Sequence, residues 1–342
     1  MKDKLSLIYK YFPFNLYDFV SYSKTVALLL TILLVVSVGG SYQIQSVEAQ
    51  LNNTSSVSEL IAKGDSLFYL GKYEEAITWY DKALAVDPKD VNALLDKGIA
   101  LNELGRYEEA IPWYDKVLAL DPKNVDGLFN KALAFSNLGR YEEAIPWYDK
   151  ALALDPKYIR PLINKGASLH DLGRYEEAIT SLDKALEVDP KNVGALSNKG
   201  LALVQLGKHE EAITWYDKAL EVDPKFGDAL FNKGAAFSNL GRHQEAVTLY
   251  DKALEVNPKD VKALVNKGGS LAELGRYEDA ITSFDKALVI NPNDSYALRN
   301  KSLSLAELGK YEEALKWIDK ALMVDPTDKI ALDLKSKLQE VL

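Results

Sequence analysis

The side chains that carry most enzyme chemistry are few and scattered in this sequence. The three histidines, His170, His209 and His243, lie far apart along the chain, and none has carboxylates at the spacing of a metal site. No phosphate-binding loop, nucleophile elbow or zinc-protease motif occurs. The glutamates of the recurring EEA triplet favour a role at helix N-termini over acid–base catalysis. We therefore predict that the protein is not an enzyme and holds no cofactor or metal.

A row of amides is the more informative chemical pattern. It begins with Asp96 and continues at a constant step with Asn130, Asn164, Asn198, Asn232, Asn266 and Asn300. Each amide both donates and accepts hydrogen bonds, so a row of them can pair with the backbone of an extended peptide whatever its side chains. The same amides can also bond the neighbouring backbone of their own chain. The sequence leaves both interpretations open.

These amides belong to a unit that recurs with a period of 34 from residue 57 onward. Proline marks the period at positions 88, 122, 156, 190, 224, 258, 292 and 326. In the unit from Val91 to Asn124, Asp90 is a good N-cap for a first helix, and Gly105 is suited to the positive φ that follows a helix. A second helix begins near residue 107 and ends at Asp121, before Pro122. The period predicts an all-α solenoid of helix pairs.

Small residues indicate where the two helices of a unit meet. Gly98 and Ala110 lie between apolar positions, so we expect the helices to cross closely there. Substitution of Ala110 by leucine should overpack this crossing.

The pattern resembles the tetratricopeptide repeat (TPR) family. The matching residues in one unit are Leu94, Gly98, Leu101, Tyr107, Ala110, Tyr114 and Pro122. The resemblance implies eight repeats over 57–328, wound as a right-handed superhelix, and a cap helix over 329–342. Departures include Ala132 and Ser302 at the glycine position, His209 and His243 at a tyrosine position, and the helix prolines Pro112 and Pro146.

In TPR proteins the first helices line a concave face that commonly binds peptides, and the resemblance implies the same here. Counting Val91 as position 1, positions 5 and 9 would face this groove. The candidate apolar residues are Leu95, Phe129, Ile163, Phe231, Leu133 and Leu201. The asparagine row is similar to the one in the TPR superhelix of O-GlcNAc transferases. The lysines that follow the row, from Lys63 to Lys301, are expected to add a positive edge.

Five tryptophans share one position of the second helix, which allows two interpretations. We favour partial burial of Trp79, Trp113, Trp147, Trp215 and Trp317 between neighbouring repeats. Alternatively they form an outer patch, and the protein assembles through this patch or through the ends of the array. If the protein does not self-assemble, the expected partner is a separate protein or peptide.

Composition narrows the possible partners further. The 342-residue chain has a formal net charge of −9, which argues against sequence-independent binding of nucleic acid. It contains no cysteine, so disulfides, thiol nucleophiles and cysteine-ligated zinc are excluded.

The segment before the repeats, 1–56, differs from them. A basic segment, 1–24, precedes an apolar segment, 25–40, and a polar linker, 41–56. The apolar segment is predicted to be a signal peptide cleaved after Ala49 or, alternatively, an uncleaved membrane anchor. A third interpretation is a buried helix of a soluble protein. The two export interpretations both place the repeats outside the cytoplasm. Asn52 and Asn53 lie in glycosylation sequons or simply in a polar linker.

Overall fold

The computed structural model of the protein describes residues 57–342. The predicted segments 1–24, 25–40 and 41–56, with Ala49, Asn52 and Asn53, lie outside the described residues. The chain divides into two compact units, one up to Asp96 and one from Lys97 to Leu342. Among the residues described, no helix is both long and apolar enough to cross a bilayer.

Every repeat begins with a first helix of about the same length, and no strand interrupts the helices between residues 57 and 342. The first helices span residues 57–69, α4 (Val91–Glu103), α6 (Val125–Asn137), α8 (Ile159–Asp171), α10 (Val193–Gln205), α12 (Gly227–Asn239), α14 (Val261–Glu273) and α16 (Ser295–Glu307).

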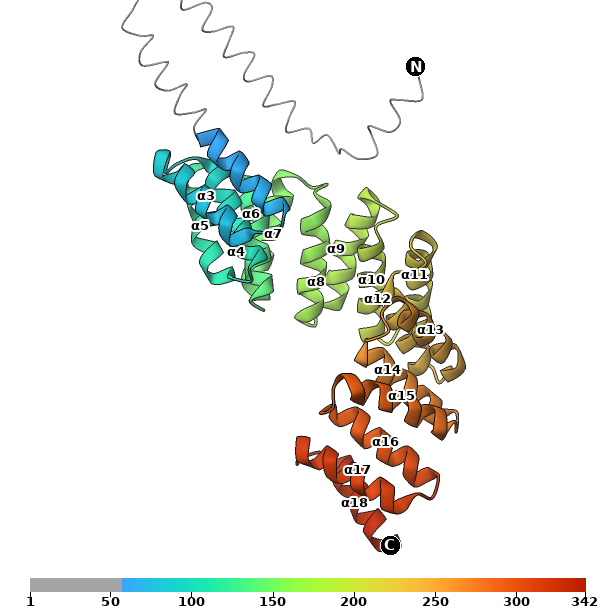
Figure 1. Ribbon diagram of the computed structural model, residues 1–342. Helices are drawn as coiled ribbons and strands as arrows, with labels where there is room; N and C mark the ends of the chain where they lie inside the picture. The colour runs from blue at the N-terminus through green and yellow to red at the C-terminus, as the bar shows by residue number, and fades with distance from the viewer. Residues whose placement is uncertain (1–56) are drawn as a thin grey trace, which may run out of the picture. The chain divides into compact units, whose positions relative to one another are not determined.

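A second helix follows each first helix after a short turn, and the two run antiparallel, as α8 and α9 do in Figure 1. The second helices are α3 (Tyr73–Val86), α5 (Tyr107–Leu120), α7 (Tyr141–Leu154), α9 (Tyr175–Val188), α11 (His209–Val222), α13 (His243–Val256), α15 (Tyr277–Ile290) and α17 (Tyr311–Val324). The expected all-α solenoid of helix pairs is thus confirmed.

Local sequence signals set these helix ends as expected. The Asp90 carboxylate accepts from the Ala93 amide at 2.8 Å, and the Asn124 side chain caps α6 in the same way. Gly105 has φ of 73°, a conformation that costs glycine little. The prolines Pro112 and Pro146 lie inside α5 and α7 without breaking either helix.

The two helices of a repeat cross where the sequence has its small residues. A Cβ atom added to Gly98 would lie 2.6 Å from the ring of Tyr114, which is fully buried. Ala110 is also fully buried. Ser302 replaces the glycine in the last repeat, and its hydroxyl donates to the Ala314 carbonyl at 2.7 Å. The close crossing predicted from Gly98 and Ala110 is therefore confirmed.

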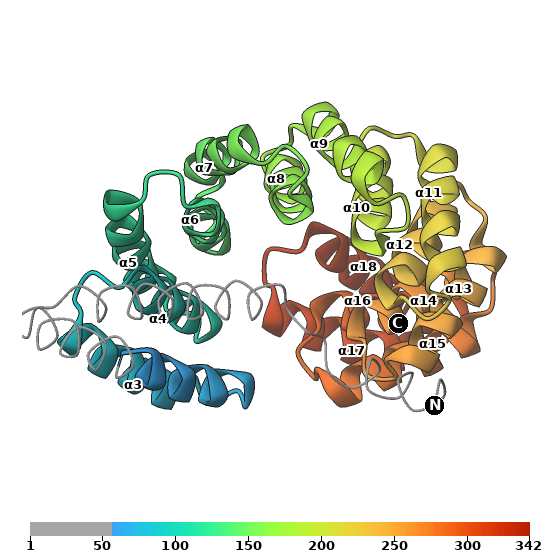
Figure 2. The same cartoon turned by 90° about the horizontal axis from the view of Figure 1, so that it is seen from above.

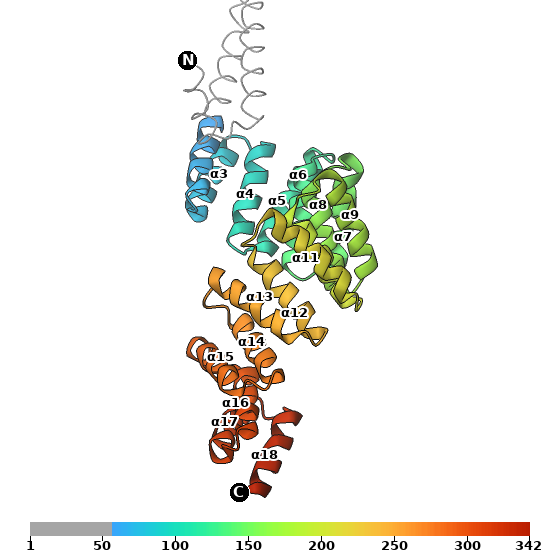
Figure 3. The ribbon, with the colours of Figure 1, turned by 90° about the vertical axis from the view of Figure 1, so that its right-hand side faces the viewer.

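One more helix, α18 (Lys329–Val341), packs on α17, beside which it lies in Figure 3. Asp328 caps it by accepting from the Ile330 and Ala331 amides. Ala331 and Leu338 are buried against the array, whereas Gln339 is exposed at a position where the preceding first helices carry leucine or phenylalanine. The helix predicted over 329–342 is therefore present.

Candidate functional site

The second unit curves so that its first helices form the inner side. Figure 2 shows α6, α8 and α10 inside α7, α9 and α11. Consecutive first helices of this unit contact one another, whereas among residues 97–342 consecutive second helices do not. Because one layer packs more closely than the other, the row bends toward the first helices. The predicted binding positions of this unit therefore lie on a concave face.

The amide row lies along this face, but its members differ in how they are engaged. The side-chain nitrogens of Asn130 and Asn164 donate to the carbonyls of Asp126 and Arg160, one turn earlier, at 2.9 Å. These two amides therefore serve their own helices, as one of the two interpretations expected. Asn266 is exposed and hydrogen-bonds the Tyr250 hydroxyl.

The remaining amides keep the ligand interpretation open. Asn198, Asn232 and Asn300 are all partly exposed on α10, α12 and α16. Together with Asn266 they form an uninterrupted row over four successive first helices.

Most of the predicted apolar residues are also partly exposed. This holds for Leu95, Ile163, Phe231, Leu133 and Leu201. Phe129 differs, because none of its side chain is accessible to solvent. The ring of Tyr158 packs against it with centroids 5.5 Å apart, and the Arg160 guanidinium lies 4.4 Å from its centroid. The expectation of an exposed side chain is wrong for Phe129.

The lysines that follow the asparagines of the row, from Lys131 to Lys301, do not form the expected positive edge. Each of seven lysines in the second unit pairs with an aspartate of the preceding second helix. The pairs are Lys131–Asp115, Lys165–Asp149, Lys199–Asp183, Lys233–Asp217, Lys267–Asp251, Lys301–Asp285 and Lys335–Asp319. We call this set the Lys–Asp ladder. The sequence signal for it was the constant 16-residue spacing between the aspartate and the lysine.

The tryptophans lie next to this ladder, and all five are partly buried, as favoured from the sequence. Lys131 and Lys150 flank Trp147, with ammonium nitrogens 3.6 and 3.8 Å from the ring centroid. A cation over an indole face is attracted by the ring quadrupole. The same arrangement recurs at Trp113, Trp215 and Trp317.

The indole also shields the ladder from solvent. Side chains of Lys131 and Lys199, which lie over tryptophan, are 9% and 10% exposed. Lys165 and Lys267 belong to repeats with Ser181 and Ser283 in place of tryptophan, and they are 23% and 22% exposed. The tryptophans therefore pack over ladder lysines of their own repeats.

The histidines lie in separate repeats of the structure. His170 is partly buried against Tyr175, with ring centroids 5.3 Å apart. His209 and His243 begin α11 and α13, where other repeats have tyrosine. No group of three potential metal ligands occurs within the part of the chain that is described.

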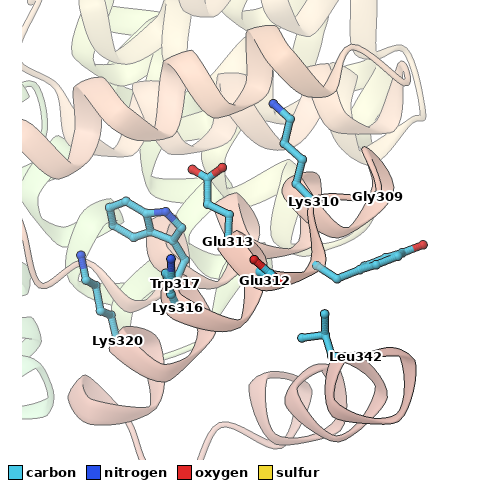
Figure 4. A pocket seen from close by; sticks show the side chains of 9 residues that line it. Gly309, Lys310, Glu312, Glu313, Lys316, Trp317, Lys320 and Leu342 are labelled. Atoms are coloured by element: carbon cyan, nitrogen blue, oxygen red, sulfur yellow. The ribbon is translucent and has the colours of Figure 1, made fainter.

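An open recess of about 940 Å³ lies away from the amide row, at the N-terminal part of α17 (Figure 4). Lys310, Lys316 and Lys320 line it with Glu312, Trp317 and Leu342. Trp317 is flanked there by Lys320 and, from α16, by Lys301. None of the predicted binding residues lines this recess.

Models of known protein families match most of the described part of the chain. A tetratricopeptide repeat model matches residues 61–125, 164–229 and 231–295, and a second matches 271–338. The chain belongs to the tetratricopeptide repeat family. A model described as anaphase-promoting complex, cyclosome, subunit 3 matches residues 103–185 of this TPR array. No curated protein matched the chain significantly.

Solved structures share the TPR fold. The chain is 18% identical to a chain of the APC/C hetero-tetramer Cut9–Hcn1, with a TM-score of 0.60 over 82% of this chain and 55% of that one. It therefore spans about half the length of that protein. PilF of Pseudomonas aeruginosa is 21% identical, with a TM-score of 0.54 over 66% of this chain and 99% of that one. Family and fold together identify a protein–protein interaction scaffold.

Proposed function

We propose that this TPR protein is a non-enzymatic scaffold that binds an extended polypeptide segment along its concave face. The row Asn198, Asn232, Asn266 and Asn300 is the observation that carries the proposal. Four amides on successive helices offer donors and acceptors at a repeated spacing, and an extended segment presents its own backbone groups periodically. Such a row binds main chain, so affinity would depend weakly on the sequence of the segment.

Variation on the concave face supports the same function. The turn glycines and the small crossing residues are nearly constant along the array. Position 5, in contrast, changes from Ile163 through Ser197, Phe231 and Val265 to Arg299. Partly exposed apolar side chains beside amides suit a segment that inserts alternate side chains.

Combined substitution of Asn198→Ala and Asn232→Ala tests the proposal. Both side chains are partly exposed, so helicity and the melting temperature should stay unchanged. Binding to a library of immobilised peptides should weaken about tenfold or more, because two hydrogen-bonding groups are lost. Asn293→Ala, in an exposed turn, is the control. Equal binding by the double variant across the library would contradict the proposal.

Self-association through the tryptophan face has less support. Lysines flank the faces of Trp113, Trp147, Trp215 and Trp317, so little indole surface remains for a second copy. We expect a monodisperse monomer in light scattering over a concentration series; association that grows with concentration would favour the assembly alternative.

We also propose that the array works outside the cytoplasm. The supporting observation is the uncharged run 25–38, preceded by Lys2, Lys4, Lys10 and Lys24. N-terminal sequencing of the protein purified from its source separates the two export routes. A start at Gln50 indicates cleavage after Ala49, and retention of the apolar run in a membrane fraction indicates an anchor. An intact leader in the cytosolic fraction would overturn the proposed location.

A further inference from the structure

Two parts of the concave face are nearly identical and lie three repeats apart. Residues 128–137 read LFNKALAFSN and residues 230–239 read LFNKGAAFSN. Phe129 packs on Tyr148 with ring centroids 6.2 Å apart, and Phe231 packs on Tyr250 at 5.9 Å. Position 5 therefore carries the same ring on the same aromatic support at both places.

The polar neighbours of these rings repeat as well. The hydroxyls of Ser136 and Ser168 lie 2.9 Å apart, and those of Ser238 and Ser270 lie 3.3 Å apart. These pairs join α6 to α8 and α12 to α14. We call the surroundings of Phe129 the first aromatic site and those of Phe231 the second aromatic site.

The first aromatic site is filled by the chain itself. The ring of Tyr158 covers Phe129, and its hydroxyl donates to the Asp126 carboxylate at 3.1 Å. Arg160, in the first turn of α8, places its guanidinium over the same phenylalanine ring. Burial, followed by the charge of Asp126, raises the pKa of Tyr158 to about 12, so the phenol stays a donor at neutral pH.

The second aromatic site has the same receptor but lacks the phenol. Asp228 and Lys262 stand where the first site has Asp126 and Arg160, and both are exposed. Asp260 stands where the first site has Tyr158, and its carboxylate turns away to cap α14, accepting from the Ala263 amide at 3.1 Å. Phe231 accordingly stays partly exposed, whereas Phe129 is fully buried.

We propose that Phe231, Asp228 and Lys262 form a binding site for a tyrosine side chain of the bound polypeptide segment. The first aromatic site shows the pose: the ring lies on phenylalanine, the hydroxyl donates to aspartate, and a cation stands beside it. This inference rests on the proposed function, because the tyrosine belongs to the segment on the concave face. It adds a side-chain preference to a row of amides that reads only the main chain.

The N-caps on this face agree with the assignment. Tyr158 occupies the N-cap position of α8 and makes no side-chain cap bond, although a polar cap there stabilises a helix. Filling the first aromatic site thus replaces a helix cap with an aromatic contact. At the second site the cap is kept and the contact is left to another molecule.

A reciprocal exchange tests the proposal in the full chain. Asp260→Tyr places the phenol on Phe231, and Tyr158→Asp removes it from Phe129 while supplying a cap to α8. The probe is N-acetyltyrosinamide, and its binding is measured from chemical-shift changes in NMR spectra of the protein. It should bind one site in the natural chain, none in Asp260→Tyr, and two in Tyr158→Asp. Asp260→Asn keeps a capping side chain and should leave binding unchanged.

Chemical preference is tested with three Gly/Ser nonapeptides that carry tyrosine, phenylalanine or alanine at the centre. The tyrosine peptide should bind the natural chain most tightly, with an affinity about tenfold higher than that of the alanine peptide. Asp228→Ala should lower the affinity for the tyrosine peptide to that for the phenylalanine peptide. Circular dichroism confirms that each variant is folded. Equal affinities for all three peptides, or probe binding that ignores both exchanges, would overturn the proposal.

The two proposals fail differently. Peptides that bind equally well and depend on Asn198 and Asn232 would leave the proposed function standing and remove the tyrosine site. Binding of N-acetyltyrosinamide at Phe231 without binding of any peptide would keep the tyrosine site and remove the proposed function. Absence of both kinds of binding overturns both.

Discussion

Asp96 is the one carboxylate in the row of asparagines. Burial raises its pKa to about 7, and the charges of Asp65 and Asp90 add to the effect. Asp65 accepts a hydrogen bond from the Tyr80 hydroxyl at 2.9 Å, and burial raises its pKa as well. A carboxyl group whose pKa is higher in the folded state binds its proton more tightly there, so deprotonation favours unfolding.

Asp96→Asn should therefore stabilise the protein at neutral pH. In the natural chain the contribution of Asp96 to the free energy of unfolding falls as the pH rises from about 4 to about 7. We expect the free energy of unfolding to rise by about 1–2 kcal/mol at about pH 7.5 and by almost nothing at about pH 4. The expected gain is smaller than the full pKa shift of Asp96 would give, because solvent reaches part of this side chain. Urea unfolding at both pH values measures the difference. A constant offset between the two proteins would contradict the assigned pKa.

Two adjacent glycines of α14 show how helix packing selects residues. A Cβ on Gly268 would lie 2.5 Å from the ring of Phe284, which is fully buried on α15. A Cβ on Gly269 would meet nothing within 4 Å. The first glycine permits two helices to cross, whereas the second faces the concave side.

Gly268→Ala and Gly269→Ala should consequently shift stability in opposite directions. The first overpacks the crossing and should cost about 1–3 kcal/mol. The second removes backbone freedom from the unfolded chain and should gain about 0.5–1 kcal/mol. Thermal and urea unfolding of the two variants measure both effects, and each serves as the other's control. Similar shifts in the same direction would show that the crossing can relax.

Local signals were sufficient to predict the elements, and long-range contacts were not. Asp90, Asn124 and Gly105 act within a few residues of their own positions, so their roles could be inferred from sequence. Phe129 was misjudged because Tyr158, which covers it, lies far along the sequence, at the start of the next helix pair. The second aromatic site, formed by Phe231, Asp228 and Lys262, could be assigned only by comparing α12 and α14 with α6 and α8 in the structure.

Within residues 97–342, the Lys–Asp ladder extends these contacts over the array. Each lysine reaches the second helix of the preceding repeat, and in several repeats it also lies over a tryptophan of its own repeat, as Lys199 does over Trp215. In a solenoid, stability is the sum of terms within repeats and terms at the interfaces between neighbours. The ladder belongs to the interface terms, so we expect it to couple the unfolding of neighbouring repeats.

Asp183→Ala should therefore weaken one interface near the middle of the second unit. Lys199, only 10% exposed, would keep its charge and lose its carboxylate partner. We expect a loss of about 1–2 kcal/mol, since a mostly buried charge left without its partner is costly. The urea transition should also broaden, because the repeats on either side of the interface begin to unfold separately.

The matched control removes an aspartate that joins no repeats. Asp333 pairs with Lys337 within α18 at 2.7 Å, and both side chains are largely exposed. An exposed ion pair on one helix contributes little to stability. Asp333→Ala should therefore change the free energy of unfolding by less than about 0.5 kcal/mol and leave the steepness of the urea transition unchanged. Equal effects of the two substitutions would mean that the ladder neutralises charge without coupling the repeats. A broadened transition for Asp183→Ala alone would instead show that cooperativity along the array depends on these ion pairs between repeats.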